Sequence, residues 1–319
     1  MVDALLGSLE MLVSPMILFF MLGVISVLAR SDLRFPAQVS KMLSLYLMFA
    51  IGFKGGVEVS HGGLDGTLFL AIGASIALSF GIPFIAFFIL RRFNGLDRLN
   101  AAAVSAHYGS VSVVTFAAAV AFLVSRDVPF EPYLVALLAI MEAPAIISGL
   151  FLANKATTSK GSIRNAMVSG SVVLLLGSFL IGAVTGEPGM VELGPVVHAP
   201  FHGVLCLFLL DMGILTAVRA RELDGINWRI VVFGIVMPLV GGTLGALCGA
   251  LVSMSVGGVT LLAVLAASAS YIVVPAAMRE SVPEANPALY LTLSLGITFP
   301  FNIVIGIPIY HTMAMALAG

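Results

Sequence analysis

The stretch AHYGSVSVVTF, residues 106–116, indicates a break in a membrane helix, because it places polar residues and a Gly between two apolar segments. The apolar segments on its two sides are LNAAAVSA, residues 99–106, and VVTFAAAVAFLV, residues 113–124. Neither segment reaches the roughly 20 apolar residues that one spanning helix needs. Gly109 marks a point where the backbone can leave the helical path. We therefore expect an interrupted helix here.

A second stretch of the same kind begins with VTLLAVLAASAS and continues as YIVVPAAMRE, residues 259–280. Its Ser-rich centre is followed by Pro275, and a proline inside a helix removes a backbone hydrogen bond and favours a kink. Two interrupted helices are thus expected, one in each half of the chain.

The composition places both stretches in a lipid bilayer. Of the 319 residues 60% are hydrophobic and only 10% are charged, which is typical of an integral membrane protein. The formal net charge of −1 provides no basic surface for nucleic acid, so that class of partner is excluded.

Apolar segments long enough to cross the membrane divide the chain into ten predicted spans. The predicted spans are Leu12–Ala29, Ala37–Phe53, Thr67–Leu90, Leu99–Val124, Tyr133–Ala153, Ile163–Val184, Pro200–Val218, Ile230–Met254, Gly257–Met278 and Pro287–Ala318.

Basic residues collect in every second link, as expected of links on the cytoplasmic side of a plasma (inner) membrane. Thirteen of the 15 basic residues follow odd-numbered spans, and Lys54 and Arg126 are the exceptions. The predicted topology is multi-pass with both termini outside.

An offset of about 161 residues relates the two halves. It superposes Gly52 on Gly213 and aligns the two interrupted stretches, while an offset one residue shorter brings Glu142 onto Asn302. An odd number of spans per copy inverts the second copy. The fold class is therefore all-α membrane protein with two inverted five-helix repeats, residues 1–153 and 163–319, joined by a cytoplasmic link at 154–162.

Interrupted helices place backbone N–H groups, carbonyls and hydroxyls inside the membrane, where they can hold a small anion beside a cation. An alternative interpretation is that the Ser and Thr residues only allow close helix packing. Glu142 is a candidate for binding a cation or carrying a proton, and Asp211 for a packing or a functional role. His107 is either a proton carrier or a hydrogen-bond donor to another helix.

No enzyme motif accompanies these features. HExxH, GxSxG and paired intramembrane carboxylates are absent from the sequence, so we expect a transporter and not an enzyme. No metal site and no cofactor are assigned.

GSVSVVTFAAA, IMEAPAI, LLDMGILTA and the block from VTLLAVLAASAS through PEANPALY resemble the sodium-dependent bicarbonate transporter (permease) family, and the resemblance covers nearly the whole chain. It implies sodium–bicarbonate symport by an elevator-type mechanism in a homotrimer. It also implies a core domain from spans 3–5 and 8–10, a gate domain from spans 1, 2, 6 and 7, and a PII-like regulatory partner.

By matching position, the resemblance implies substrate-binding residues in both interruptions. These residues are Gly109, Ser110, Ser112, Ser268, Ala269 and Ser270. The candidates for the coupling ion are Tyr108, Thr115, Glu142, Tyr271 and Asn302.

One position departs from the family pattern, since Tyr271 stands where members carry an acidic residue. A carboxylate is a favourable ligand for a hard cation, and its loss leaves sodium and protons open as the driving ion. The alternative is a proton- or sodium-coupled permease of the same fold for another small solute, such as an organic anion.

Overall fold

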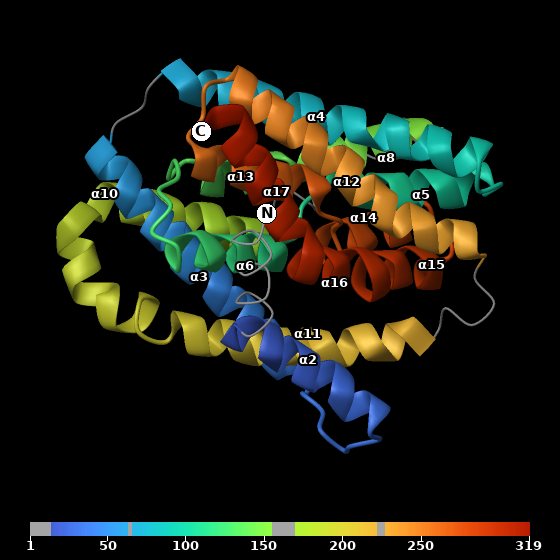
Figure 1. Ribbon diagram of the computed structural model, residues 1–319, viewed down its shortest axis with the longest axis horizontal. Coiled ribbons are helices and arrows are strands. Elements are labelled where there is room, and N and C mark those ends of the chain that lie inside the picture. The colour runs from blue at the N-terminus through green and yellow to red at the C-terminus, as the bar shows by residue number, and fades with distance from the viewer. Residues whose placement is uncertain (1–13, 63–65, 155–169, 222–226) are drawn as a thin grey trace.

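The computed structural model describes residues 14–62, 66–154, 170–221 and 227–319, and these residues form helices and no strand (Figure 1). The helices of the first half are α2 (Pro15–Leu28), α3 (Ala37–Gly62), α4 (Gly66–Arg92), α5 (Arg98–Gly109), α6 (Val113–Val124), α7 (Leu134–Ile140) and α8 (Glu142–Leu152). The helices of the second half are α10 (Gly170–Val197), α11 (Phe201–Arg221), α12 (Trp228–Leu251), α13 (Val256–Ala267), α14 (Val273–Ser281), α15 (Pro287–Leu291), η2 (Thr292–Thr298), α16 (Phe299–Phe301), η3 (Asn302–Gly306) and α17 (Ile307–Ala318).

Among the described residues, 8 helical stretches are long and apolar enough to cross a membrane. Two shorter apolar helices, Pro15–Leu28 and Val256–Ala267, coincide with the first and ninth predicted spans. This arrangement agrees with a multi-pass membrane protein, and the shortness of the ninth-span helix reflects its expected interruption.

Both interruptions are present. Helix α5 ends at Gly109, and Ser110 continues in an extended conformation before Ser112 begins α6 by accepting a hydrogen bond from the Thr115 backbone N–H. Helix α13 ends at Ala267, and α14 begins only at Val273. The prediction of two interrupted helices is therefore confirmed.

Three boundaries differ from the prediction. Helix α3 continues beyond Phe53 to Gly62, and α7 and α8 divide the fifth span at Met141. The sixth span was expected to end at Val184, but α10 continues to Val197 across a kink at Gly186, whose φ is 54°. The predicted link at 154–162 lies outside the described residues except for Asn154.

Two helix pairs with close backbone contact lie together on one side of the molecule. Helix α3 packs along α10, and α11 packs along α2 (Figure 1). A Cβ on Gly52 would lie 2.6 Å from the Leu175 carbonyl oxygen of α10, and one on Gly213 would lie 3.0 Å from the Phe20 carbonyl carbon of α2. Glycine is needed at both positions because another helix's backbone occupies the space of a side chain.

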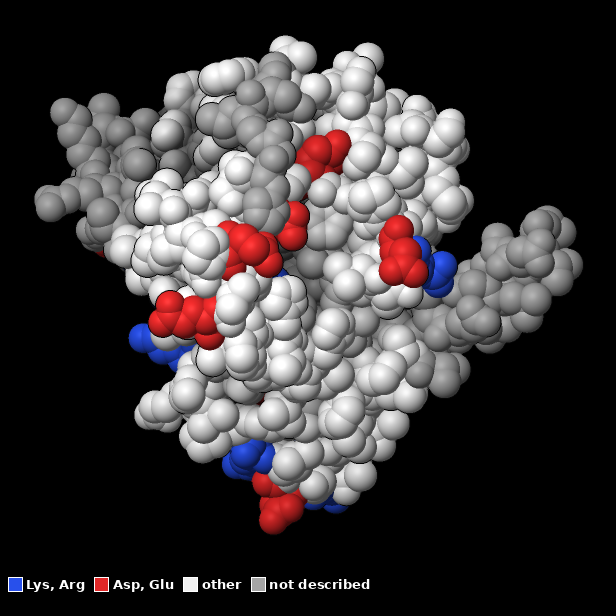
Figure 2. All heavy atoms as spheres, turned by 90° about the vertical axis from the view of Figure 1, so that its left-hand side faces the viewer, with Lys and Arg blue, Asp and Glu red and all other residues white. Residues whose placement is uncertain are grey.

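The remaining helices pack around the two interruptions. Helix α5 lies against α4 and α8, and α13 lies against α12 and α17. The interrupted stretches themselves are buried on all sides, with every residue from Ala101 to Ala119 and from Val259 to Ser270 in the interior. Figure 2 shows a mostly uncharged surface on which acidic side chains gather near the middle of one face.

Candidate functional site

The two interruptions meet each other in space. The backbone N–H of Ser270 donates a 2.9 Å hydrogen bond to the carbonyl oxygen of His107, which belongs to the last turn of α5. Helix α5 leaves that carbonyl without a partner in its own helix, and the second interruption satisfies it. The chain thus brings together two segments about 160 residues apart in the sequence.

A small cavity lies where the second halves of the interrupted helices begin. Its lining includes Val113 and Val273, the first residues of α6 and α14, together with Ser112 and Ser270 just before them. Helix N-termini carry free N–H groups and the positive end of the helix dipole, which favour an anion. The remaining lining residues are Met48, Val111, Glu142, Tyr271 and Ile272.

Glu142 supplies a carboxylate to this cavity from a third element, the start of α8. Its side chain is 5% exposed, and its Oε2 atom is buried without a hydrogen-bond partner among the described residues. A carboxylate in that position needs a proton, a cation or a polar ligand, because an unpaired buried charge is strongly unfavourable. The cavity therefore combines features that attract an anion with a group that attracts a cation.

The six predicted substrate residues differ in their surroundings. Ser112 and Ser270 line the cavity. Gly109 and Ala269 are buried beside it, and Gly109 approaches α4 so closely that a Cβ would lie 2.5 Å from the Ser79 carbonyl oxygen. The Ser268 hydroxyl donates to the Val264 carbonyl of its own helix at 2.6 Å.

Ser110 differs from Ser268. Its side chain is fully buried, and its hydroxyl has no hydrogen-bond partner among the described residues. The packing interpretation, in which a small hydroxyl bonds back to its own helix, therefore describes Ser268 and does not describe Ser110.

Two of the coupling candidates have protein partners away from the cavity. The Tyr108 hydroxyl lies 2.7 Å from Thr298 Oγ1, which itself donates to the Gly234 carbonyl. The Asn302 amide donates at 2.9 Å to the Ala267 carbonyl and accepts a 2.9 Å bond from the Tyr310 hydroxyl. Asn302 therefore satisfies the C-terminal carbonyl of α13, a structural contribution to the interruption.

Thr115 stays beside the cavity. Its hydroxyl donates to Ser112 Oγ at 2.9 Å, and its backbone N–H donates to the same oxygen at 3.2 Å. Both bonds hold the Ser112 side chain at the start of α6, so Thr115 positions a lining hydroxyl.

Tyr271 borders a second, much larger cavity as well. This vestibule has a volume of ≈ 1130 Å³, and its lining includes Ser40 and Lys41 in the first turn of α3 and Tyr271 and Ile272 in the second interruption. Most of its other lining residues are apolar and come from α3, α10 and α11.

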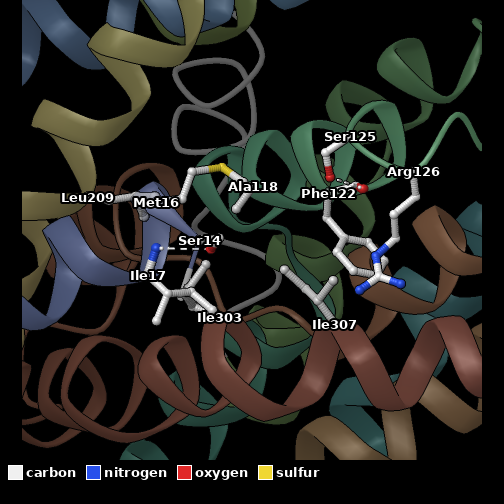
Figure 3. Close-up of a pocket in the computed structure, with 10 residues that line it drawn as sticks. All are labelled: Ser14, Met16, Ile17, Ala118, Phe122, Ser125, Arg126, Leu209, Ile303 and Ile307. Atoms are coloured by element: carbon white, nitrogen blue, oxygen red, sulfur yellow. Dashed lines mark hydrogen bonds between the residues drawn. The ribbon is translucent and has the colours of Figure 1, made fainter. Parts of the chain in front are cut away.

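A third cavity lies among α2, α6, α11, η3 and α17 (Figure 3). It has a volume of ≈ 290 Å³ and is lined by Ser14 and Ile17 near the start of α2, Phe122 of α6, and Arg126, whose guanidinium carbon lies 4.7 Å from the Phe122 ring centroid. None of its lining residues borders the small cavity between the interruptions.

Two intramembrane residues take roles that the sequence left open. The His107 ring bonds the Ala103 carbonyl of its own helix at 2.6 Å and stacks on Tyr290 with centroids 4.4 Å apart. The expected hydrogen bond from His107 to another helix is not seen among the described residues, because the ring faces an aromatic neighbour. Asp211 lies on α11 with its side chain 8% exposed, and this helix packs against both α2 and α3.

The start of α5 is fixed outside the membrane by Asp97. Its carboxylate accepts 3.0 Å hydrogen bonds from the backbone N–H groups of Leu99 and Asn100. Desolvation alone would raise the pKa of Asp97, but the bonds from Asn100 and Leu99 outweigh it and hold the pKa below its ordinary value. This cap positions the helix that ends at Gly109.

Sequence reasoning missed the parts of the site that other elements supply. Met48 comes from the middle of α3, where no polar residue or break marks it, and Thr298 lies in the π-helical segment η2. Val113 and Val273 could have been predicted, because each is the first helical residue after an interruption that the sequence marks.

One family model matches the chain over residues 15–315, and its description is the Na+-dependent bicarbonate transporter superfamily. The match covers both interrupted stretches and all helices that line the cavities. No curated protein matches the chain.

Proposed function

The chain belongs to the Na+-dependent bicarbonate transporter superfamily, a family of transporters and not of enzymes, and from this premise we propose that it takes up bicarbonate together with sodium. The observation that supports this proposal best is the small cavity at the N-termini of α6 and α14, lined by two hydroxyls and one carboxylate. A small oxyanion and a cation would neutralise each other there.

In this proposal the anion binds between the two interruptions. Ser112 and Ser270 donate hydroxyl hydrogen bonds, and the N–H groups at the start of α6 and α14 provide the positive helix ends. Gly109, Ser110, Ser268 and Ala269 contribute through buried backbone and the unpaired Ser110 hydroxyl. Oxyanion recognition by backbone N–H groups and hydroxyls needs no Arg or Lys in the membrane.

Sodium is the proposed coupling ion, held by oxygen ligands. Glu142 supplies a carboxylate to the lining of the cavity. Tyr271 and Ser112 line the same cavity, and Thr115 holds the Ser112 hydroxyl. Tyr108 and Asn302 support the interruptions from the side through the partners described above.

The inverted repeat is part of the proposal, and the glycine contacts support it. Gly52 of α3 approaches α10, and Gly213 of α11 approaches α2, so that equivalent residues make equivalent contacts in the two halves. Spans 1, 2, 6 and 7 would form the gate domain from these four helices. The core domain of spans 3–5 and 8–10 would then carry the cavity past them in an elevator-type movement.

Shared lining residues suggest from which side the small cavity is approached. Met48, Tyr271 and Ile272 line both the small cavity and the vestibule, whereas the cavity at Arg126 shares no lining residue with the small cavity. Because the vestibule includes Lys41 and basic links mark the cytoplasmic side, we assign an inward-facing state with both termini outside. A homotrimer and a PII-like regulatory partner complete the proposal and are supported by the resemblance of the sequence to the family.

The test is uptake of labelled bicarbonate by purified protein in liposomes with an inward sodium gradient. We expect uptake to depend on the gradient and to be lost in the double variant Ser110→Ala, Ser270→Ala at unchanged protein yield. Uptake that does not depend on the sodium gradient would contradict sodium coupling, and absence of uptake would contradict bicarbonate as the substrate. Full activity of the double variant would contradict the assigned binding site.

The apolar vestibule favours one alternative, a permease for another small solute such as an organic anion. A passage lined mostly by Leu, Phe, Met and Ile is less unfavourable for an organic anion, which carries apolar groups, than for a hydrated inorganic ion. Glu142 would then carry a proton or bind sodium. Uptake that responds to a pH gradient without sodium, and that bicarbonate does not reduce, would favour this alternative.

A further inference from the structure

The small cavity and the vestibule are separated by a thin wall. Three residues, Met48, Tyr271 and Ile272, line both spaces. Met48 belongs to α3, whereas Tyr271 and Ile272 belong to the second interruption, so the wall is shared between two groups of helices. Whatever enters the small cavity from the vestibule must pass these side chains.

Tyr271 is oriented across this wall. Its hydroxyl oxygen is buried and has no hydrogen-bond partner among the described residues. The residue as a whole is only partly buried, and it lines both the small cavity, together with Ser112, and the vestibule. The ring packs edge-on against Phe299 with centroids 5.8 Å apart, which holds it in this orientation.

The small cavity has no room for an anion in this structure. Its volume is ≈ 10 Å³, and a cavity needs about 10–15 Å³ to hold one water molecule. An oxyanion with four non-hydrogen atoms is larger than one water, so it cannot bind between Ser112 and Ser270 while Tyr271 stays in place. Ser112 is fixed by its bonds to Thr115, whereas the Tyr271 ring faces an open space into which it can turn.

We propose that the Tyr271 side chain is the gate between the small cavity and the vestibule, closed in the position that it takes here and open when its ring turns into the vestibule. The gate rests on the transport function proposed above, because it controls access to that binding site. The ring is the steric element that closes the passage.

Cysteine accessibility tests the gate without any transport measurement. Cys206 and Cys248 are the two cysteines of the chain, and both are replaced by Ala to give a background without thiols. Ser270→Cys then reports on the small cavity, and Ser44→Cys reports on the vestibule. Purified protein is reacted with 2-sulfonatoethyl methanethiosulfonate, which is too large for the closed cavity, and the modification rate is measured by mass spectrometry.

The rate at Ser270→Cys should follow the fraction of time that the gate is open. Minor conformations are populated at about 0.1–10%, so Tyr271→Ala should raise this rate by about tenfold or more. Tyr271→Phe retains the ring and should stay close to the parent rate. The Ser44→Cys reporter should be modified at the same rate in the protein with Tyr271 and in the Tyr271→Ala variant.

Each outcome decides the proposal. Equal rates at Ser270→Cys for Tyr271 and Tyr271→Ala would overturn the gate, as would a rise in Tyr271→Phe as large as that in Tyr271→Ala. If Tyr271→Ala gives no monodisperse protein, Tyr271→Leu, which is shorter but still packs on Phe299, takes its place with the same criteria. The modification rates are measured without an anion, so they test the gate even if the protein transports a substrate other than bicarbonate. Equal rates would contradict the gate but would not contradict the proposed transport function.

Discussion

Replacing Gly109 by Ala tests the close approach of α5 to α4 that positions the first interruption. A Cβ at Gly109 would lie 2.5 Å from the Ser79 carbonyl oxygen and 2.7 Å from Pro83 Cδ. Ordinary van der Waals contacts of a Cβ begin at 3.4 Å, so the first of these contacts falls 0.9 Å short. Backbone of α4 and a rigid proline ring cannot yield as a flexible side chain would.

The required shift would reach the small cavity between the interruptions. The Ser79 hydroxyl donates to the carbonyl of Met141, the residue directly before Glu142. Moving α4 away from Gly109 therefore disturbs the element that carries the buried carboxylate. Overpacking of this kind typically costs about 1–3 kcal/mol, and we expect the upper part of that range because backbone must move.

Gly81→Ala is the matched control for this change. Gly81 lies on the same helix α4, and no atom lies within 4 Å of a Cβ built there. Ala in place of Gly inside a helix is favourable by about 0.5–1 kcal/mol, so the two variants should change stability in opposite directions.

The assay is thermal unfolding in detergent, followed by bicarbonate uptake in liposomes. We expect Gly109→Ala to unfold at lower temperature than the parent and to lose uptake, while Gly81→Ala keeps both. A Gly109→Ala variant with parental unfolding temperature and parental uptake would refute the reasoning, since the close packing would then be unnecessary.

Three further predictions follow from single contacts. Asn302→Ala should lower stability by about 1–3 kcal/mol, because it leaves the Ala267 carbonyl buried without its partner, and thermal unfolding would show the loss. Asp97→Ala should lower the free energy of unfolding by about 1 kcal/mol at pH 7, and Asp97→Asn should lower it less. The folded pKa of Asp97 is below its unfolded value of about 3.9, so the stability that the carboxylate adds should be complete above about pH 3.9 and should disappear as the pH falls through the folded pKa. Glu142→Gln should retain the fold but abolish the dependence of uptake on the driving ion, and an unchanged gradient dependence would exclude Glu142 from coupling.

The interruptions could be predicted from sequence because their signals are local. Gly109 and Pro275 mark positions where a helix is hard to continue, and the half-helices beside them are too short to span alone. The composition and the spacing of the apolar segments were sufficient for the membrane class. The structure adds that the interrupted segments bond each other, through Ser270 and His107.

The end of α10 could not be predicted, because its sequence imitates a polar link. Glu187, Pro188, Glu192 and Pro195 follow Val184, and such residues usually end a span. The positive φ of Gly186 breaks the helix just before Pro188, so that this proline falls in the first turn of a new helical segment, where its missing N–H group costs nothing.

The lining of the cavity could be predicted only in part. Ser112 and Ser270 were among the predicted substrate residues, but no spacing along the chain says that Glu142 at the start of α8 faces the space between the two interruptions. The proposed repeat paired Glu142 with Asn302, which bonds the end of α13 and does not line the cavity. If the repeat holds, these two equivalent positions have different roles.

Tyr271 and Glu142 together set the charge of the proposed site. Each helix N-terminus contributes about +0.5 elementary charge, so α6 and α14 together offset one ionised Glu142. A bound sodium–bicarbonate pair is neutral and preserves that balance. A second carboxylate at position 271 would make the empty site negative by about one charge, and the anion could then bind only after a cation. With a tyrosine there, protonation of Glu142 or binding of one cation would be sufficient in the proposed site to balance the charge of the anion, and we therefore expect the choice of driving ion to depend on Glu142.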